Sequence, residues 1–132
     1  MKVADASFFI ALLRDNDAHH ARANELIDQI LQDKQSLIAT THVIEETVTY
    51  IFSQEGSEAA YRAVRLFLEA QNVRIETINS KDIEAAGDLV RKYKKFSLSD
   101  ALSVWTAWKH EILEVVSFDS DFDHVERIRR IY

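Results

Sequence analysis

Acidic side chains recur in this sequence where the chain is expected to leave a strand or to enter a helix. Asp5 and Asp119 each follow a short apolar run that is typical of a buried strand. Asp100 and the neighbouring acids Glu45 and Glu46 lie in the first or second turn of expected helices. In a parallel α/β sheet all these positions can lie at one edge, the edge at which such folds bind ligands.

A cluster of carboxylates at that edge would be suited to a hard divalent cation. Carboxylates that lie close together raise each other's pKa, so such a cluster is stable mainly when a cation occupies its centre. The chain has no cysteine, and a ligand set made only of oxygen favours Mg²⁺ or Mn²⁺ over zinc. Such an ion can activate water and neutralise the charge that develops on a phosphodiester. The pattern therefore predicts metal-dependent phosphodiester hydrolysis.

The acids at two of these expected strand and helix ends can also be interpreted as structural residues that cap a helix or form a turn. Asp100 closes the segment Ser97-Leu98-Ser99-Asp100, which has the form of a helix capping box. Asp119 and Asp121 follow the apolar run 115–116, and Asx turns after a strand are common. Taken singly, these acids would be interpreted as structural residues.

Of the remaining acids, the two glutamates can also be interpreted as surface residues, whereas Asp5 cannot easily be. Glu45 and Glu46 could lie on a solvated helix edge, and helical periodicity does not decide which of them faces a pocket. Asp5 is harder to explain as a surface residue, because it lies between the apolar pairs Val3-Ala4 and Phe8-Phe9. A buried carboxylate needs a cation or a hydrogen-bonding partner.

Strands and helices are expected to alternate along the chain. The expected strands cover residues 2–4, 37–39, 73–78, 115–116 and 127–132, and the expected helices cover 8–13, 18–32, 41–54, 57–71, 80–95 and 97–108. Such alternation implies parallel strands joined by right-handed crossovers. The predicted fold is an α/β protein, a three-layer α/β/α sandwich whose central parallel sheet has about four to five strands.

Apolar spacing predicts which helical residues are buried. The expected core residues of the third to sixth helices are Ile44, Val48, Ile51, Phe52, Ala60, Val64, Phe67, Leu68, Ile83, Ala86, Val90, Ala101, Leu102, Val104, Trp105, Ala107 and Trp108. For the two tryptophans, core or dimer contact is favoured over base stacking. The pair His19-His20 is expected to be solvated, and His42, His110 and His124 are expected at the surface or in satisfied, partly buried positions.

Composition limits the class of protein. The 132 residues include 47% hydrophobic residues and no candidate linker, which favours one domain over residues 1–132. No apolar stretch reaches membrane-spanning length and no secretion signal is visible, so a cytoplasmic protein is expected. The net charge of -6 has the wrong sign for holding nucleic acid by bulk electrostatics. A nucleic-acid substrate would require metal ions and local basic patches.

Four short motifs, in this order, resemble the PIN-domain family and in particular VapC-type toxin ribonucleases. They are Asp5-Ala6-Ser7, Thr41-His42-Val43-Ile44-Glu45-Glu46-Thr47, Leu98-Ser99-Asp100-Ala101-Leu102 and Ser117-Phe118-Asp119-Ser120-Asp121-Phe122. Each motif is weak alone, but their order and spacing together are more specific. The resemblance covers essentially the whole chain.

The resemblance implies a role for each acid. The family's acidic quartet, which binds Mg²⁺ or Mn²⁺ for RNA cleavage, is matched by Asp5, Glu46, Asp100 and Asp119. Glu46 is preferred to Glu45 because it falls three residues after Val43, where the family's helix carries its acid. Ser7 and Ser117 match supporting positions beside the metal, and Asp121 is a candidate additional ligand.

The resemblance also implies partners, namely an RNA substrate, a second copy in a homodimer and, in toxin members, a VapB-type antitoxin. Lys92, Lys94 and Lys95 are hypothesised to contact RNA phosphates, although a basic run commonly complements the dipole of a helix end.

Two rival classes of protein are considered. The first is a catalytically silent PIN-like domain that binds RNA or protein. The second, a receiver-like or aspartyl-phosphatase domain, is disfavoured because Asp5 is followed by Ala6 and Ser7 and no lysine follows Val115-Val116.

Overall fold

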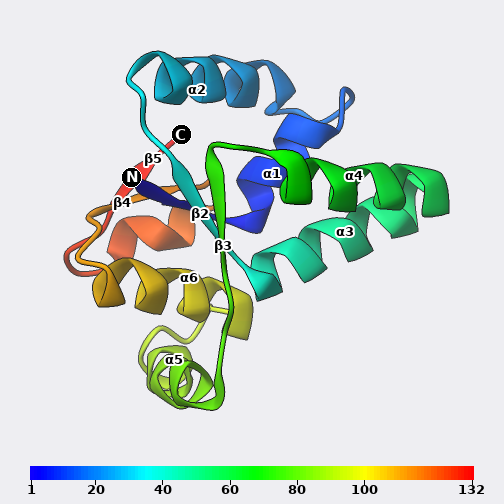
Figure 1. Ribbon diagram of the computed structural model, residues 1–132. Coiled ribbons are helices and arrows are strands. Elements are labelled where there is room, and N and C mark those ends of the chain that lie inside the picture. Colours follow the sequence, from blue (N-terminus) through cyan, green and yellow to red (C-terminus); the bar gives the residue numbers. More distant parts are fainter.

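The structure is a computed structural model that describes all residues, 1–132. Its strands are β1 (Lys2–Ala4), β2 (Leu37–Thr40), β3 (Val73–Glu76), β4 (Glu114–Val116) and β5 (Arg129–Ile131). Its helices are α1 (Ala6–Leu13), α2 (His20–Gln32), α3 (Thr41–Glu55), α4 (Ser57–Glu69), α5 (Ser80–Lys92), α6 (Leu98–Lys109) and the short 3₁₀ helix η1 (Ser120–His124). The strands form one sheet in the order β3-β2-β1-β4-β5 (Figure 1). Every pair is parallel, which confirms the predicted fold class.

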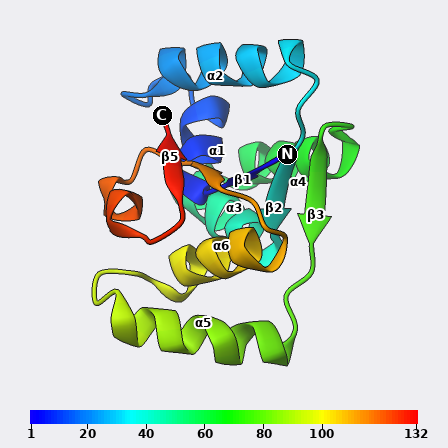
Figure 2. The same cartoon turned by 90° about the vertical axis from the view of Figure 1, so that its left-hand side faces the viewer.

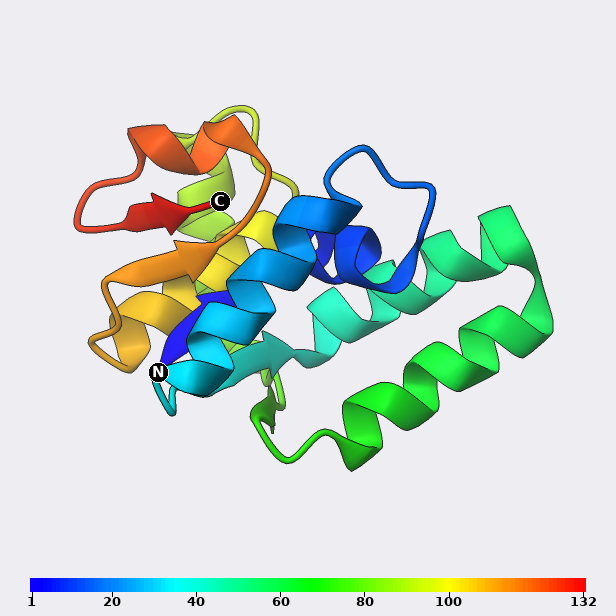
Figure 3. The same cartoon turned by 90° about the horizontal axis from the view of Figure 1, so that it is seen from above.

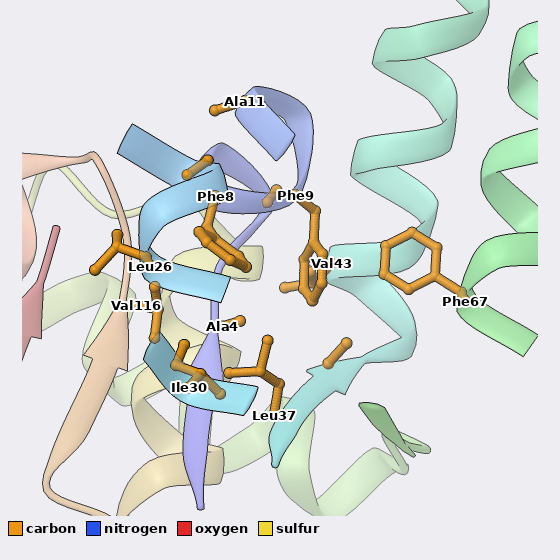
Figure 4. Packing of buried hydrophobic residues seen from close by; sticks show 13 residues of the cluster. Ala4, Phe8, Phe9, Ala11, Leu26, Ile30, Leu37, Val43, Phe67 and Val116 are labelled. Atoms are coloured by element: carbon orange, nitrogen blue, oxygen red, sulfur yellow. The ribbon is translucent and has the colours of Figure 1, made fainter. Parts of the chain in front are cut away.

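The central strands are buried on both faces, which explains their continuous apolar sequence. Val3 of β1 lies opposite Ile38 of β2 and Val115 of β4, and these three side chains pack in the core cluster that includes α5 and α6. The next residues, Ala4 and Val116, are also paired and point to the other face, because side chains alternate along a strand. There they pack in the cluster formed with α1 and α2 (Figure 4).

Helices therefore cover both faces of the sheet. In Figure 2, α2 and α1 lie above the strands, and α6 and then α5 lie below them. Strand β5 pairs with β4 at one edge of the sheet, as expected for a final edge strand. None of the helices is both long and apolar enough to cross a membrane.

Helices α3 and α4 form a hairpin that projects from the sheet (Figure 3). They are joined at Gly56, whose φ of 85° is a conformation that glycine adopts without the steric cost of a side chain. Small residues on α4, Ala59 and Ala63, pack against Ile51 of α3 in a cluster separate from the two main ones. The outer part of the hairpin thus depends on contacts between its own two helices.

Three apolar residues predicted to be buried are exposed. Phe52 is 58% exposed, Leu68 is 62% exposed and Ile83 is 42% exposed. On α3 and α5 the polar side chains Thr47 and Asp82 occupy buried positions, although the predicted core residues Ile51 and Ala86 are buried as expected. Apolar spacing therefore misplaced single residues and not the whole buried faces. On α4 the buried face consists mainly of alanines. The spacing of large apolar residues such as Leu68 therefore does not identify that face.

The remaining core predictions hold more closely. Ala86, Ala101, Leu102, Val104 and Ala107 are fully buried. Trp105 and Trp108 are half-buried, and their indole N–H groups donate to Asp82 Oδ1 at 2.9 Å and to the Glu126 carbonyl at 3.3 Å. Both tryptophans thus belong to the packing of α6.

Candidate active site

Asp5 lies between β1 and α1, where it caps the helix N-terminus. It is only 3% exposed. Its Oδ2 atom accepts hydrogen bonds from the Ser7 amide at 3.2 Å, the Ser7 hydroxyl at 2.9 Å and the Ser117 hydroxyl at 3.2 Å. Its Oδ1 atom is buried and has no hydrogen-bonding partner. A buried carboxylate oxygen without a partner is costly unless a ligand satisfies it.

Ser7 and Ser117 connect Asp5 to the loop that follows β4. Each hydroxyl can donate to Asp5 Oδ2 and accept a backbone N–H of that loop. The Phe118 amide donates to Ser7 Oγ at 3.0 Å, and the Asp119 amide donates to Ser117 Oγ at 3.0 Å. The two serines therefore fix the positions of Asp5 and Asp119 relative to each other.

Asp100 stands at the start of α6 and completes the capping box that its sequence predicts. The Ser97 amide and hydroxyl donate to Asp100 Oδ2 at 2.8 Å and 2.7 Å, and the Asp100 amide donates to Ser97 Oγ at 3.1 Å. The capping interpretation is thus correct, and it leaves the second carboxylate oxygen, Oδ1, free. A capping role and a role in the site are compatible in this geometry.

The acids influence each other's ionisation. Burial, together with the negative charge of Asp100, raises the pKa of Asp5 to about 6. Burial also raises the pKa of Asp100, and the charges of Asp119 and Asp121 add to that effect. Asp5 and Asp119 follow the neighbouring parallel strands β1 and β4, so these two acids leave the sheet at the same edge.

Asp119 begins the turn that leads into η1. Its Oδ1 accepts the Asp121 amide at 2.8 Å, so the predicted Asx turn is present. Arg130 of β5 supports this turn from behind, with two hydrogen bonds of 2.8 Å to Asp123 and one of 3.4 Å to the Ser117 carbonyl. The Arg130 side chain is largely buried, so the turn is attached to the edge strand.

Glu46 is placed differently from the other acids. It is exposed on α3 and lines an open hollow that it shares with Glu45, His42 and Ser99. Ser99 precedes Asp100, so Glu46 faces the start of α6. No three acidic or histidine side chains lie close enough together to form a ready metal-binding group.

Several histidine predictions need correction. His42 is not satisfied, because its Nδ1 atom is buried without a hydrogen-bonding partner. His20 is half-buried, and its Nδ1 lies 2.8 Å from the Ala11 carbonyl. His19 is exposed, but its ring stacks on Phe118. His110 contacts Glu76 through Nε2 at 3.0 Å, and His124 is exposed, both as predicted.

The basic run at the end of α5 borders the acids. Lys95 Nζ lies 3.5 Å from Asp121 Oδ1, and Lys92 Nζ lies 3.1 Å from Glu126 Oε1. Lys94 and Lys95 line a small hollow together with Asp121 and His124. Positive charge therefore lies beside the acidic edge, although Lys92 and Lys95 are each paired with a carboxylate and, within the run, only Lys94 has no ion pair.

Sequence reasoning missed the residues that support the site through tertiary contacts. The sequence predicts only an edge strand at Arg130, whereas in the structure Arg130 contacts Asp123, seven residues earlier, across the turn through η1. The sequence shows Phe118 only as part of the last motif, whereas in the structure it contacts His19, nearly one hundred residues away. Neither contact has a local sequence signal.

The fold and the site define a class of protein, a parallel α/β domain whose carboxylates gather at the carboxyl ends of strands β1 and β4. The model of the PIN domain family matches residues 2–128, and the chain belongs to this family.

Two curated relatives share 24% identity with the chain over 131 residues, with 99% of each sequence covered. They are a VapC ribonuclease of Mycobacterium bovis and ribonuclease VapC13 of Mycobacterium tuberculosis. Among solved structures, Mycobacterium tuberculosis VapC20, described as a sarcin-ricin loop cleaving toxin, is similar with a TM-score of 0.81, 27% identity and 93% of each chain covered. A toxin-antitoxin complex from Klebsiella pneumoniae is similar in fold, with a TM-score of 0.71, 16% identity, and 98% of this chain and 96% of that chain covered.

Proposed function

We propose that this PIN domain is a metal-dependent endoribonuclease that hydrolyses RNA phosphodiester bonds and acts as the toxin of a VapBC-type toxin-antitoxin pair. The family, the ribonuclease relatives and the edge of coupled carboxylates support this proposal. The observation that carries it is Asp5 Oδ1, a buried carboxylate oxygen that no protein group satisfies. A cation is the simplest partner for such an atom.

In this proposal Asp5, Asp100 and Asp119 hold Mg²⁺ or Mn²⁺, and Glu46 completes the site or positions the attacking water. Asp121 is a further candidate ligand. When bound, the ion supplies an activated water and neutralises developing charge on the phosphate. The oxygen-only donor set fits such an ion.

The protein's own groups prepare the site in two ways. Ser7 and Ser117 hold Asp5 Oδ2, which leaves Asp5 Oδ1 as the oxygen available to a ligand. Ser97 holds Asp100 Oδ2 in the capping box and so restricts the rotation of that carboxylate. Side chains fixed by hydrogen bonds of this kind give a site its preorganised geometry.

We further propose that residues 1–132 act as one domain, that the chain forms a homodimer, and that a VapB-type antitoxin blocks the acidic edge. The Klebsiella pneumoniae structure with a similar fold is a toxin-antitoxin complex, which supports an antitoxin partner. One observation favours a second candidate function, a catalytically silent RNA- or protein-binding domain: no three acids are arranged as a ready metal-binding group.

Cleavage of RNA decides between these two functions. We expect the purified chain to cleave single-stranded RNA with Mg²⁺ or Mn²⁺ and not with EDTA. Asp100→Asn is expected to lower the rate by at least about a hundredfold, the scale of loss when a preorganised charged contact at a reaction centre is removed. As a control, Asp88→Asn changes a surface acid of α5 that is paired only with Arg91, and it is expected to leave cleavage unchanged. Full activity of Asp100→Asn would refute the proposed site.

Replacing Lys92, Lys94 and Lys95 with glutamine is expected to weaken RNA binding. For each lysine that contacts a phosphate of single-stranded RNA, the slope of log affinity against log salt concentration should fall by about 0.7. Filter binding of RNA to the triple variant over a series of salt concentrations measures this slope.

The matched control for the lysine variant removes the same charge elsewhere. Lys34 lies before β2, Lys81 lies at the opposite end of α5 from the basic run, and Arg62 lies on the projecting helix α4. All three are exposed, and their glutamine triple variant is expected to bind RNA with an unchanged salt slope. If both triple variants behaved alike, the basic run would have no specific role in RNA binding.

A further inference from the structure

We propose that His19 and Phe118 form a stacking platform for a nucleobase of the RNA next to the acidic edge. This inference rests on the proposed ribonuclease function and deepens it, because it assigns a contact to the base rather than to the phosphate.

The rings of His19 and Phe118 are stacked, with centroids 4.4 Å apart and planes inclined by only 6°. Phe118 is half-buried against the core, whereas His19 is exposed. Because Phe118 covers one face of the imidazole, the open surface of His19 is its other face and its edge. That is the geometry in which a third flat ring can continue a stack.

The polar atoms of the His19 ring are also free. No hydrogen bond or ion pair involves either ring nitrogen, whereas the adjacent His20 uses Nδ1 toward the Ala11 carbonyl. The hydrogen bonds of His19 are made by its backbone: the amide donates to Asp17 Oδ1 at 2.8 Å, and the carbonyl accepts from the Ala23 amide at 2.8 Å. The fold thus fixes the place of this residue while leaving the imidazole nitrogens available to a ligand.

The platform is built into the loop that carries the acid Asp119. Phe118 lies between Ser117 and Asp119, and its amide donates to Ser7 Oγ, which also contacts Asp5. Figure 3 shows this loop, which follows β4, passing beside the start of α2. A base stacked on His19 would therefore lie close to a phosphate at the acidic edge.

Helix α2, which directly follows His19, and helix α5, whose end carries the basic run, lie on opposite faces of the sheet (Figure 2). Lys95 approaches Asp121, two residues after Asp119, whereas the platform contains Phe118, one residue before Asp119. An RNA strand that crosses the acids can thus meet lysines on one side and an aromatic face on the other. Aromatic faces combined with basic side chains are the usual means by which proteins bind single-stranded RNA.

A plainer interpretation is that His19 only attaches the segment between α1 and α2 to the loop after β4. The two interpretations differ for leucine at position 19. Leucine can pack on Phe118 and keep an attachment, but it offers no flat surface to a base. Phenylalanine preserves both the attachment and the stack.

The test uses the full chain in an Asp5→Asn background, so that the RNA stays intact. The probes are short oligoadenylates in which 2-aminopurine replaces one adenine at each position in turn, since stacking tolerates any base. Stacking of 2-aminopurine on an aromatic ring quenches its fluorescence. We expect quenching at one position with His19 and with His19→Phe. We expect His19→Leu to lose that quenching and to bind RNA about tenfold more weakly, the scale for loss of one stacked base.

Tyr61→Leu is the matched control, because it removes an exposed ring from the projecting helix α4 and should change neither readout. If His19→Leu binds and quenches like the parent, the platform is refuted, while RNA cleavage by the chain with Asp5 intact would still support the ribonuclease. If quenching depends on His19 but the chain with Asp5 cleaves no RNA, the platform stands and the ribonuclease fails. Absence of RNA binding would overturn both.

Discussion

Asp5→Asn is expected to abolish RNA cleavage and, at the same time, to make the metal-free protein more stable. The wild-type carboxylate is buried, and burial together with Asp100 raises its pKa to about 6 from 3.8. Ionisation of Asp5 at neutral pH therefore destabilises the folded protein. An asparagine can still accept the hydrogen bonds of Ser7 and Ser117 through its amide oxygen, but it carries no charge. The function proposed for this residue thus opposes its contribution to stability.

The sign and size of the expected change in stability follow from the pH dependence of folding. Because the pKa of Asp5 is higher in the folded state, folding binds a proton between about pH 4 and pH 6. The stabilising contribution is fully present below the unfolded pKa and is lost as the pH rises through about 6. This shift in the pKa of Asp5 corresponds to at most about 3 kcal/mol in the free energy of unfolding. We expect the metal-free wild type to unfold in urea more readily at pH 7 than at pH 5.

In Asp5→Asn the loss of stability between pH 5 and pH 7 should be much smaller, because the variant lacks the carboxyl group that causes most of it. Asp100 is then the main acid left with a raised pKa. At pH 7 the variant should be more stable than the wild type by about 1 to 3 kcal/mol. Mn²⁺ should raise the melting temperature of the wild type and not that of the variant. The control Asp88→Asn alters an exposed carboxylate and should keep the wild-type pH profile. A variant that is less stable than the wild type at pH 7 would contradict the assignment of strain to Asp5.

The architecture could be predicted because its signals are local. Each buried strand is a short apolar run such as Val115-Val116, and alternation with helices then requires parallel pairing. Helix starts were also readable, since the capping box at Ser97 and Asp100 forms as its sequence indicates. The margins of the buried helix faces were less predictable, because Thr47 is buried and Phe52 is exposed, and such choices depend on the shape of the opposing surface.

The candidate site could be predicted only as a set of residue types in order. The coupling of Asp5 with Asp100 follows from the topology, because the end of β1 and the start of α6 meet at one edge. The hydrogen bonds of Ser7 to the loop after β4 and the support from Arg130 depend on tertiary packing, which no spacing in the sequence reveals. Glu46 was expected near the start of α6, and it lines a hollow together with Ser99, the residue before Asp100. Helical periodicity did not decide between Glu45 and Glu46, and both line that hollow.

The second large effect is expected at Phe122, which anchors the acidic turn in the core. Its side chain is 0% exposed and packs against Phe96 with ring centroids 5.2 Å apart. Phe122→Ala is expected to lower the free energy of unfolding by about 3–5 kcal/mol, the range for truncating a buried phenylalanine. Because Phe122 directly follows Asp121, the variant should also lose Mn²⁺-induced stabilisation under conditions in which it remains folded. Urea unfolding with and without Mn²⁺ measures both effects.

Phe52 provides the matched comparison for Phe122, since it is the same residue type in a helix but is 58% exposed. Phe52→Ala is expected to change the free energy of unfolding by no more than about 0.5 kcal/mol and to keep the response to Mn²⁺. Equal losses of stability in the two variants would show that Phe52 is buried, as its apolar spacing predicts. A Phe122→Ala protein that is folded and responds fully to Mn²⁺ would show that the turn holds Asp119 without its anchor, through Arg130 and the serine hydroxyls alone.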